Sequence, residues 1–384
     1  MDESKLSILE AIADSILKKC KVYDLESEIS LNYKTEATSR FANSQITQNV
    51  EENSISLALT LAKGKRFVSE KTTEISDQKL TALIANLNDN LEKGQDIPFY
   101  SGFVESSVKY PTLKMNSKFW DVEKRANVIA DVVQLSEEIN KNAKMAGTCS
   151  SEEAIYFFQS SNGRKNSFPF NINQFKVNTI VEKGSKRGYG QKELFWRNKE
   201  PKYSELTEQA IDVGTSTLNA THKEPGDYKV VLSQQAVADL LLFVQYMLLA
   251  GYFHGGQCFF SEIATQVFDD KLSIKDMPLE TSLSRVSLAH DAEGVPRRNK
   301  VVINEGKVNF IPYSSFDAMQ FLNDKSKVTG DSFEHNFALC TSFVQSAGST
   351  NDSDLIHDVQ NGLYVNRFWY GPTTARFILV SAII

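Results

Sequence analysis

The chain has 384 residues, of which 41% are hydrophobic and 23% are charged, and this composition excludes an intrinsically disordered protein. The formal net charge is -6 and no long cluster of Lys and Arg occurs, which excludes nucleic acid as a direct partner because phosphate binding depends on clustered positive charge. The N-terminus is acidic, and no apolar run approaches the ~20 residues that span a bilayer. We therefore expect a cytoplasmic protein without a membrane partner.

The N-terminal part predicts a helix, an antiparallel meander and a second helix. Apolar residues at helical spacing indicate an amphipathic helix over residues 5–19. Four short strands should follow, with Lys63-Gly64-Lys65 as the turn of the last hairpin, and a helix over about 77–91 should end at Gly94. The expected strands are Glu28–Lys34, Ser39–Thr47, Ser54–Ala62 and Arg66–Thr72.

A similar unit is expected after an irregular connection over residues 95–118. It should contain a helix over about 121–142, a second meander, and a closing helix over 203–218. In the meander we expect strands over 154–159, 175–182 and 193–196, an Asn162-Gly163 turn, and a turn at Gly184, Gly188 and Gly190.

The polar stretch from Asn219 to Gly226 is the predicted domain boundary, because it combines Pro, Gly and charged residues ahead of a clear strand. We expect an N-terminal domain over 1–222, with sub-parts of about 1–95 and 115–222, and a C-terminal domain over 223–384. The latter should open with a strand over 228–232 and a helix over about 234–249 that Ser233 caps and Gly251 stops. The predicted class is α+β: antiparallel meanders with flanking helices, then a mainly antiparallel β domain with one prominent helix.

A motif of mixed charge precedes a hairpin in the C-terminal part. Asp291-Ala-Glu-Gly-Val-Pro-Arg-Arg298 runs into two strand-like segments that flank Asn304-Glu-Gly306, where glycine supplies the positive φ of a short turn. Asp291, Glu293, Arg297 and Arg298 either line a cleft and bind a peptide or hold the loop through ion pairs within it.

Taken with three further segments, this motif resembles the TldD/PmbA family, whose founding members were named as modulators of DNA gyrase. The resemblance spans roughly residues 25 to 370. The further segments are Ser39-Arg-Phe-Ala-Asn-Ser-Gln-Ile-Thr-Gln-Asn49, Glu224-Pro-Gly-Asp-Tyr-Lys-Val-Val-Leu-Ser233 and Asn361-Gly-Leu-Tyr-Val365.

Catalytic members of that family carry His-Glu-x-x-x-His on a helix, and this chain does not. Its five histidines are followed by Lys, Gly, Asp, Asn and Asp, so none is followed by Glu. The resemblance therefore implies the TldE/PmbA-like branch: a non-catalytic subunit that pairs with a zinc-bearing TldD-like homologue in a metallopeptidase acting on unfolded or extended peptides. No cofactor is expected in this chain, and zinc is expected in the partner.

Two weaker metal candidates come from the residues themselves. His254 and Cys258 are four residues apart, but the two glycines between them cost a continuous helix about 1 kcal/mol each, so a Gly-rich loop with a buried thiol is favoured. Glu334-His335 with Cys340 is a second candidate, against an ordinary core cysteine beside a polar edge. The remaining cysteines, Cys20 and Cys149, show no Cys-x-x-Cys spacing, so reduced thiols are expected.

The last residues, 371–384, match nothing in the family at that place, and we expect a truncated or frameshifted C-terminus. The uncharged run from Phe377 to Val380 and the final Ile383-Ile384 would form a strand-prone edge and lower solubility, unless the tail packs as an ordinary core strand. Two other functions stay open: a metallopeptidase in its own right with degenerate ligands such as His254 and Cys258, and a self-associating regulatory protein that forms a homodimer.

Overall fold

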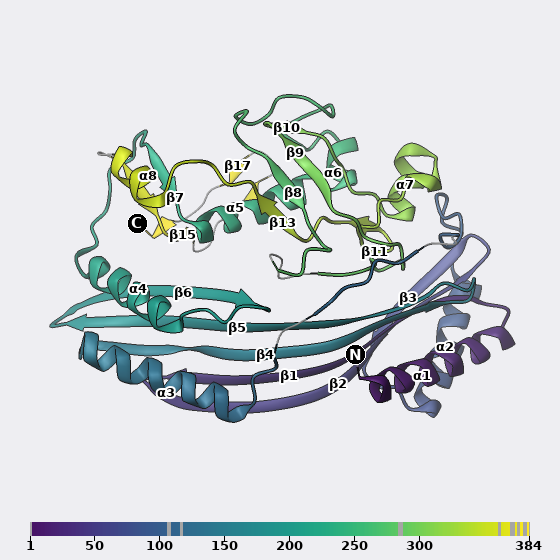
Figure 1. Cartoon of the computed structure of the whole chain (residues 1–384). Coiled ribbons are helices and arrows are strands. Elements are labelled where there is room, and N and C mark those ends of the chain that lie inside the picture. The colour runs from purple at the N-terminus through teal and green to yellow at the C-terminus, as the bar shows by residue number, and fades with distance from the viewer. Residues whose placement is uncertain are drawn as a thin grey trace. The chain divides into compact units, whose positions relative to one another are not determined.

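The computed structural model describes residues 2–105, 109–115, 118–282, 287–359, 362–368, 373–374, 377–378 and 382–383. These form two compact units, one of Met1–Asn219 with Thr281–His290 and one of Ala220–Glu280 with Asp291–Ile384 (Figure 1). Both units combine helices with antiparallel sheet, so the chain is of the α+β class, as predicted.

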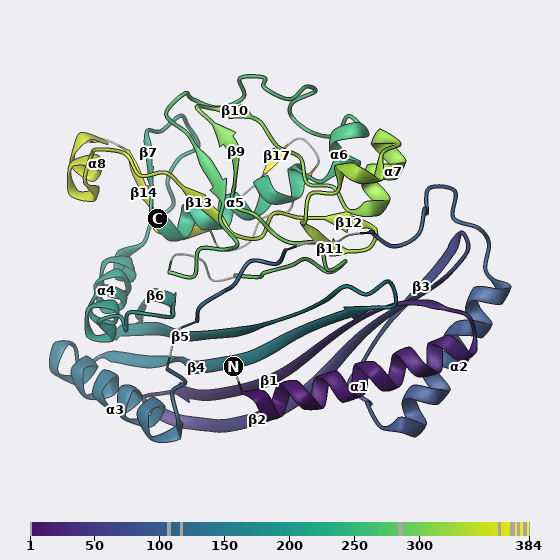
Figure 2. The same cartoon turned by 45° about the vertical axis from the view of Figure 1, so that its right-hand side comes forward.

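The first unit is built on a six-stranded antiparallel sheet in the order β3-β2-β1-β4-β5-β6. Figure 2 shows its long strands running side by side. The strands are β1 (Glu26–Ala42), β2 (Gln45–Lys63), β3 (Arg66–Thr72), β4 (Ala143–Ser160), β5 (Lys165–Lys183) and β6 (Lys186–Trp196).

Of the four short strands predicted before residue 73, the last, Arg66–Thr72, is confirmed as β3, and the turn at Gly64 precedes it. The first three were wrong, because β1 and β2 form one long hairpin. They pair from Glu26 opposite Ala62 to Ala42 opposite Gln45. Asn43 and Ser44, at φ 49° and 59°, form the turn inside a segment that had been assigned to a strand. Every side chain from Gln45 to Asn53 is exposed, so this half of β2 lacks the alternation of polar and apolar residues from which strands are predicted. β4 and β5 are likewise longer than predicted.

Four helices cover one face of this sheet, in two pairs. α1 (Glu3–Val22) and α2 (Asp77–Lys93) pack on Ile29 and Leu31 of β1. α3 (Val122–Ile139) and α4 (Tyr203–Ser216) pack on Phe41 of the same strand. These three residues occupy alternate positions of β1 and therefore point to the same face. All four helices lie where the sequence predicted them, and Gly94 caps the end of α2 as expected.

Two glycines that had been assigned to a turn serve a different purpose. Gly184 does lie in the β5–β6 turn, with φ +61°. Gly188 and Gly190, however, lie within β6, where the backbone of α4 comes close to the strand. A Cβ on Gly190 would lie 1.9 Å from the carbonyl oxygen of Ala210, so only glycine permits this contact.

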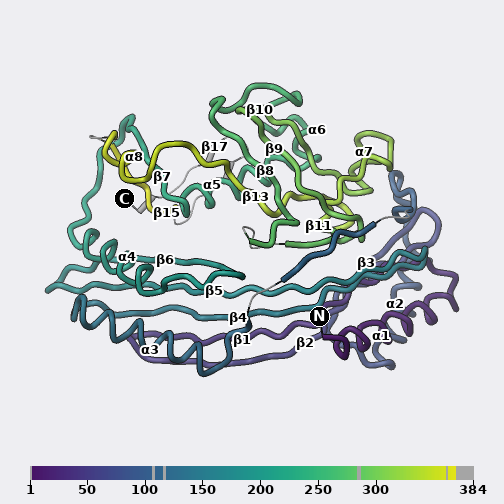
Figure 3. The backbone as a smooth tube through the Cα atoms, viewed as in Figure 1, coloured from purple at the N-terminus to yellow at the C-terminus, as the bar shows by residue number. Residues whose placement is uncertain are grey.

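The second unit contains a four-stranded antiparallel sheet in the order β10-β9-β8-β13, which carries its core on residues such as Ile274, Val302 and Ile303. Figure 3 traces this unit's path through helices and short strands. Its elements are β7 (Val230–Leu232), α5 (Gln234–Met247), α6 (Ala250–His254), β8 (Ile274–Asp276), β9 (Lys300–Asn304), β10 (Lys307–Val308), α7 (Ser315–Leu322), β11 (Ser332–Glu334), β12 (Phe337–Ala338), β13 (Phe343–Gln345), α8 (Asp352–Val359) and β14 (Leu363–Val365).

The predicted hairpin of this unit is confirmed, with Glu305 and Gly306 at φ 49° and 76° in the turn between β9 and β10. Ser233 caps α5 as predicted, since its hydroxyl accepts from the N–H of Ala236. The predicted stop at Gly251 was wrong: α5 ends at Met247, and Gly251 lies inside α6. Glycine commonly follows the last residue of a helix, so a glycine inside the short helix α6 gives the same signal in the sequence as the end of α5.

β7 pairs with β14 in parallel, with Val230 opposite Leu363 and Leu232 opposite Val365. Two of the family-like segments, far apart in the sequence, are therefore hydrogen-bonded neighbours. The last short pairs are β15 (Arg367–Phe368) with β18 (Ala382–Ile383) and β16 (Thr373–Thr374) with β17 (Phe377–Ile378). The other residues of the expected apolar C-terminal edge lie outside the described ones. Among the helices that the structure describes, none has the length and apolar character to cross a bilayer.

Candidate functional site

Asp291, which opens the charged motif, is buried and shapes the loop that follows it. One carboxylate oxygen accepts from the N–H groups of Glu293 at 3.0 Å and Val295 at 2.8 Å. The other accepts from the N–H of Ser332 in β11 at 2.9 Å. Burial, and next the negative charge of Glu293, raise the pKa of the Asp291 carboxyl to about 8. Asp291 therefore holds backbone in place and is not presented to solvent.

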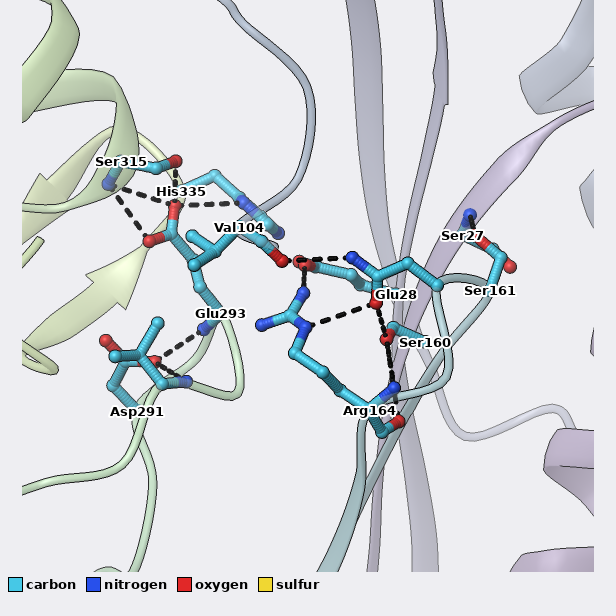
Figure 4. A network of polar contacts seen from close by, with 12 residues as sticks. Ser27, Glu28, Val104, Ser160, Ser161, Arg164, Asp291, Glu293, Ser315 and His335 are labelled. Atoms are coloured by element: carbon cyan, nitrogen blue, oxygen red, sulfur yellow. Dashed lines mark hydrogen bonds and ion pairs between the residues drawn. The ribbon is translucent and has the colours of Figure 1, made fainter. Parts of the chain in front are cut away.

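Glu293 is 1% exposed and lies at the N-terminal end of α7. Its carboxylate accepts from the N–H of Ser315 at 3.0 Å and from the Ser315 hydroxyl at 2.6 Å, and it lies 3.3 Å from Nδ1 of His335. Figure 4 shows Glu293 between these two residues. A carboxylate is favoured here because the first N–H groups of a helix lack partners within the helix and carry partial positive charge.

Arg297 is also buried, whereas Arg298 is exposed. Nη1 of Arg297 donates to Oγ1 of Thr341 at 3.1 Å and lies 3.7 Å from Oδ1 of Asp331. Gly330, at φ +79°, allows close packing here, since a Cβ on it would lie 2.4 Å from the carbonyl oxygen of Pro296. The structure thus separates the four candidate residues into three buried side chains and one at the surface.

The Arg297–Asp331 pair belongs to a buried ionic cluster that the sequence did not predict. Nζ of Lys300 lies 2.5 Å from Oδ1 of Asp331 and 3.1 Å from Oδ2 of Asp276. The other oxygen of Asp276 accepts from the N–H of Ser342 at 2.7 Å. The side chains of Lys300, Asp276 and Asp331 are 7%, 0% and 0% exposed. Two carboxylates thus face two cations out of water, which satisfies the requirement that buried charges be paired.

Cys340 completes this cluster. Its thiol and one carboxylate oxygen each from Asp276 and Asp331 all lie within 4.8 Å of one another. Burial is the largest cause of the raised pKa of both Asp276 and Cys340, and the nearby carboxylates add to it at the thiol. In the part of the chain that the structure describes, this is the one group of three or more His, Cys, Asp or Glu residues with the spacing of metal ligands.

His254 and Cys258 do not form the helical pair considered from the sequence. α6 ends at His254, and Gly255 and Gly256, the latter at φ +67°, turn the chain away. Nε2 of His254 lies 2.9 Å from the hydroxyl of Tyr313, and its ring stacks on Phe321 with 4.6 Å between the ring centres. The Cys258 thiol donates to the carbonyl of Met247, and burial raises its pKa to about 11. Each side chain is thus engaged with a different partner.

The second candidate pair is also divided, because His335 lies at Glu293 while Cys340 lies beside Asp276 and Asp331. Sequence reasoning missed Ser315, Asp276, Lys300 and Asp331. The only signal was weak: Lys300 directly precedes the predicted hairpin, and no motif links it to the other three residues. The structure adds the pairing of β8 with β9, which places Asp276 directly opposite Lys300.

The family resemblance of the sequence implies, by order along the chain, that α5 stands where catalytic members carry their zinc-binding helix. α5 contains neither His nor Glu. Its one charged residue, Asp239, accepts from the N–H of Phe368 at 3.0 Å. The residues of α5 therefore do not fit a zinc ion.

Comparisons with known proteins agree with this fold. Residues 225–380 match the family profile described as PmbA/TldA metallopeptidase C-terminal domain. No curated protein matches the chain. The fold is similar to that of TldE from Thermococcus kodakarensis, at TM-score 0.82 and 14% sequence identity over 93% of this chain and 82% of that one.

Two further solved structures are similar over nearly the whole chain. A proposed modulator of a DNA gyrase from Thermotoga maritima MSB8 has a TM-score of 0.81 at 15% identity, covering 94% of this chain and 83% of that one. A proposed modulator of DNA gyrase from Bacteroides thetaiotaomicron VPI-5482 has a TM-score of 0.81 at 16% identity, covering 98% of this chain and 84% of that one. At these identities the likeness concerns the fold.

Proposed function

We propose that the chain is a TldE/PmbA-like subunit without a catalytic zinc site, because residues 225–380 match the PmbA/TldA metallopeptidase C-terminal domain and the fold is similar to that of TldE. It pairs in the cytoplasm with a TldD-like homologue that carries His-Glu-x-x-x-His, and the two form a peptidase for extended or unfolded peptides. The zinc-bearing partner supplies the activated water, and this chain supplies surface that holds and orients the peptide.

The observation that supports this proposal most directly is the composition of α5. A hydrolytic zinc site uses three protein ligands and a base, and helical His-Glu-x-x-x-His provides two of the ligands and the base together. α5 offers a single carboxylate, which a backbone N–H already occupies. His254 and Cys258, the nearest alternatives in sequence, are each engaged elsewhere. The same two contacts weigh against a metallopeptidase built on this chain alone.

The charged loop contributes to peptide binding through its exposed member. The side chains of Asp291, Glu293 and Arg297 form hydrogen bonds with β11, α7 and Thr341, respectively, so they fix the loop's shape. Arg298 follows directly on this fixed frame and is exposed. A guanidinium held there is suited to a peptide carboxylate, with which it forms paired charge-assisted hydrogen bonds.

Co-purification with a TldD-like homologue tests the proposal. We expect the two chains to associate at micromolar concentration. The complex should cleave unfolded peptides in a chelator-sensitive manner, and its zinc should be bound by the partner alone. Changing the Glu of the partner's His-Glu-x-x-x-His to Gln should abolish cleavage, while H254A in this chain should not. Failure to associate, or chelator-sensitive cleavage by this chain alone that H254A removes, would refute the subunit role.

A further inference from the structure

The cluster around Lys300 has the donor set of a metal site but holds an ammonium group instead. Asp276, Asp331 and Cys340 come from three different segments of the second unit, and their potential ligand atoms lie within 4.8 Å of one another. Ligands of a tetrahedral zinc ion lie roughly 3–4 Å apart, given bonds of about 2.0–2.3 Å. Small side-chain rotations would therefore close this set around one ion.

Two independent features show that the set is arranged for a cation. Nζ of Lys300 lies between the carboxylates, 2.5 Å from Asp331 and 3.1 Å from Asp276. Asp331 is fully buried, yet its second oxygen, Oδ2, has no hydrogen-bond partner among the described residues. A buried carboxylate oxygen without a partner is costly, and coordination to a metal ion is one way to satisfy it.

The charges of the cluster balance in the native chain and would balance equally around a divalent ion. With the thiol neutral, the two carboxylates are offset by Lys300 and Arg297. A divalent ion carries the combined charge of the Lys300 ammonium and the Cys340 thiol proton. Exchanging both for one ion leaves the net charge of the buried cluster unchanged, whereas adding the ion beside a charged Lys300 leaves surplus positive charge out of water.

We infer that Asp276, Asp331 and Cys340 form a latent site for a divalent transition metal, and that Lys300 occupies its cation position in the native chain. A thiolate beside two carboxylates favours zinc or cobalt over magnesium or calcium. The inference is independent of the proposed subunit role, which concerns α5. The Lys300 ammonium group and a metal ion would compete for the same buried position between Asp276 and Asp331.

The test replaces Lys300 with an uncharged side chain of similar length, K300M, and titrates the purified full chain with cobalt. We expect K300M to bind one equivalent with the absorption band of a thiolate–cobalt bond, and zinc to displace it. The unchanged chain should show no such band. K307M, which removes an exposed lysine from the neighbouring strand β10, is the matched control and should behave like the unchanged chain.

A double variant, K300M/C340S, identifies the ligand, because it keeps both carboxylates but should lose the thiolate band. K300M leaves the carboxylate charge in excess, so its folding should also depend on metal, with a thermal midpoint that rises when zinc is added. A thiolate–cobalt band in the unchanged chain would overturn the inference, as would K300M without metal binding. Insoluble K300M from both ordinary and zinc-supplemented growth would overturn it too, because a filled site should replace the missing ammonium.

Discussion

The carboxylate of Glu293 accepts both the N–H and the hydroxyl of Ser315, the first residue of α7. This contact joins the charged loop to α7, although the hairpin of β9 and β10 lies between them in the sequence. Of the two roles considered from the sequence, lining a cleft and holding the loop through ion pairs, neither included a contact with this helix.

Removal of the Glu293 carboxylate should destabilise the second unit. E293A leaves the Ser315 donors buried without an acceptor, which should cost about 2–4 kcal/mol. E293Q retains an acceptor but loses the charge at the helix N-terminus and should cost about 1 kcal/mol. Denaturant unfolding of each variant measures the difference, with E262Q, at an exposed position, as the control. Equal stability of E293A and E262Q would contradict the assigned role.

Asp331 should be strongly coupled to Lys300. D331N removes one partner of two buried ion pairs and should cost about 3–5 kcal/mol. K300M/D331N removes a positive and a negative charge together, so its loss of stability should be smaller than the sum of the two single losses. A double-mutant cycle from unfolding midpoints measures this coupling. Strict additivity would show that the two charges do not interact.

The stability of the second unit should fall as pH rises from about 4 to about 8. The Asp291 pKa of about 8 in the folded state lies above the ordinary value of about 3.9 in the unfolded chain. Between these values the folded state retains a proton that the unfolded state has released, so raising the pH favours unfolding. Unfolding experiments across this range should show the slope in the unchanged chain and a shallower slope in D291N. An unchanged slope in D291N would assign the effect to another group.

Gly190 should tolerate no side chain. In G190A the added methyl group meets the carbonyl of Ala210 at 1.9 Å, so α4 must shift, and we expect a loss of at least about 2 kcal/mol. G251A is the informative comparison, because nothing lies within 4 Å of a Cβ at this helical position. Alanine should stabilise α6 by up to about 1 kcal/mol. Thermal unfolding of both variants tests the contrast.

Substitution of Arg298 should affect peptide binding, whereas substitution of its neighbour Arg297 should affect stability. In the proposed complex with a TldD-like partner, R298A should raise KM for acidic or C-terminal carboxylate-bearing peptides several-fold and leave the thermal midpoint unchanged. R297A should lower the thermal midpoint, because it leaves Asp331 with one cation fewer. An unchanged KM in R298A would remove the loop from peptide recognition.

The sequence predicted the elements whose signal is local. The four helices of the first unit, the Ser233 cap and the Glu305-Gly306 turn are confirmed, since helical periodicity, capping side chains and turn glycines act over a few residues. The β1–β2 hairpin was missed because Gln45–Asn53 is exposed on both faces and carries only Ile46 and Val50 as apolar residues, so it has no period-2 alternation. The ionic cluster was missed for another reason: strand register, not spacing in the sequence, places Asp276 opposite Lys300.

Because β7 pairs with β14, this part of the fold can form only late in synthesis. β7 is made early in the second unit, but its partner, Leu363–Val365, leaves the ribosome only after α5, the four-stranded sheet and α7 have been translated. The loop closed by this pairing spans most of the unit, and long loops are slow to close. During that interval the backbone groups of Val230–Leu232 lack their strand partner, so β7 stays unpaired until the end of the unit has been made.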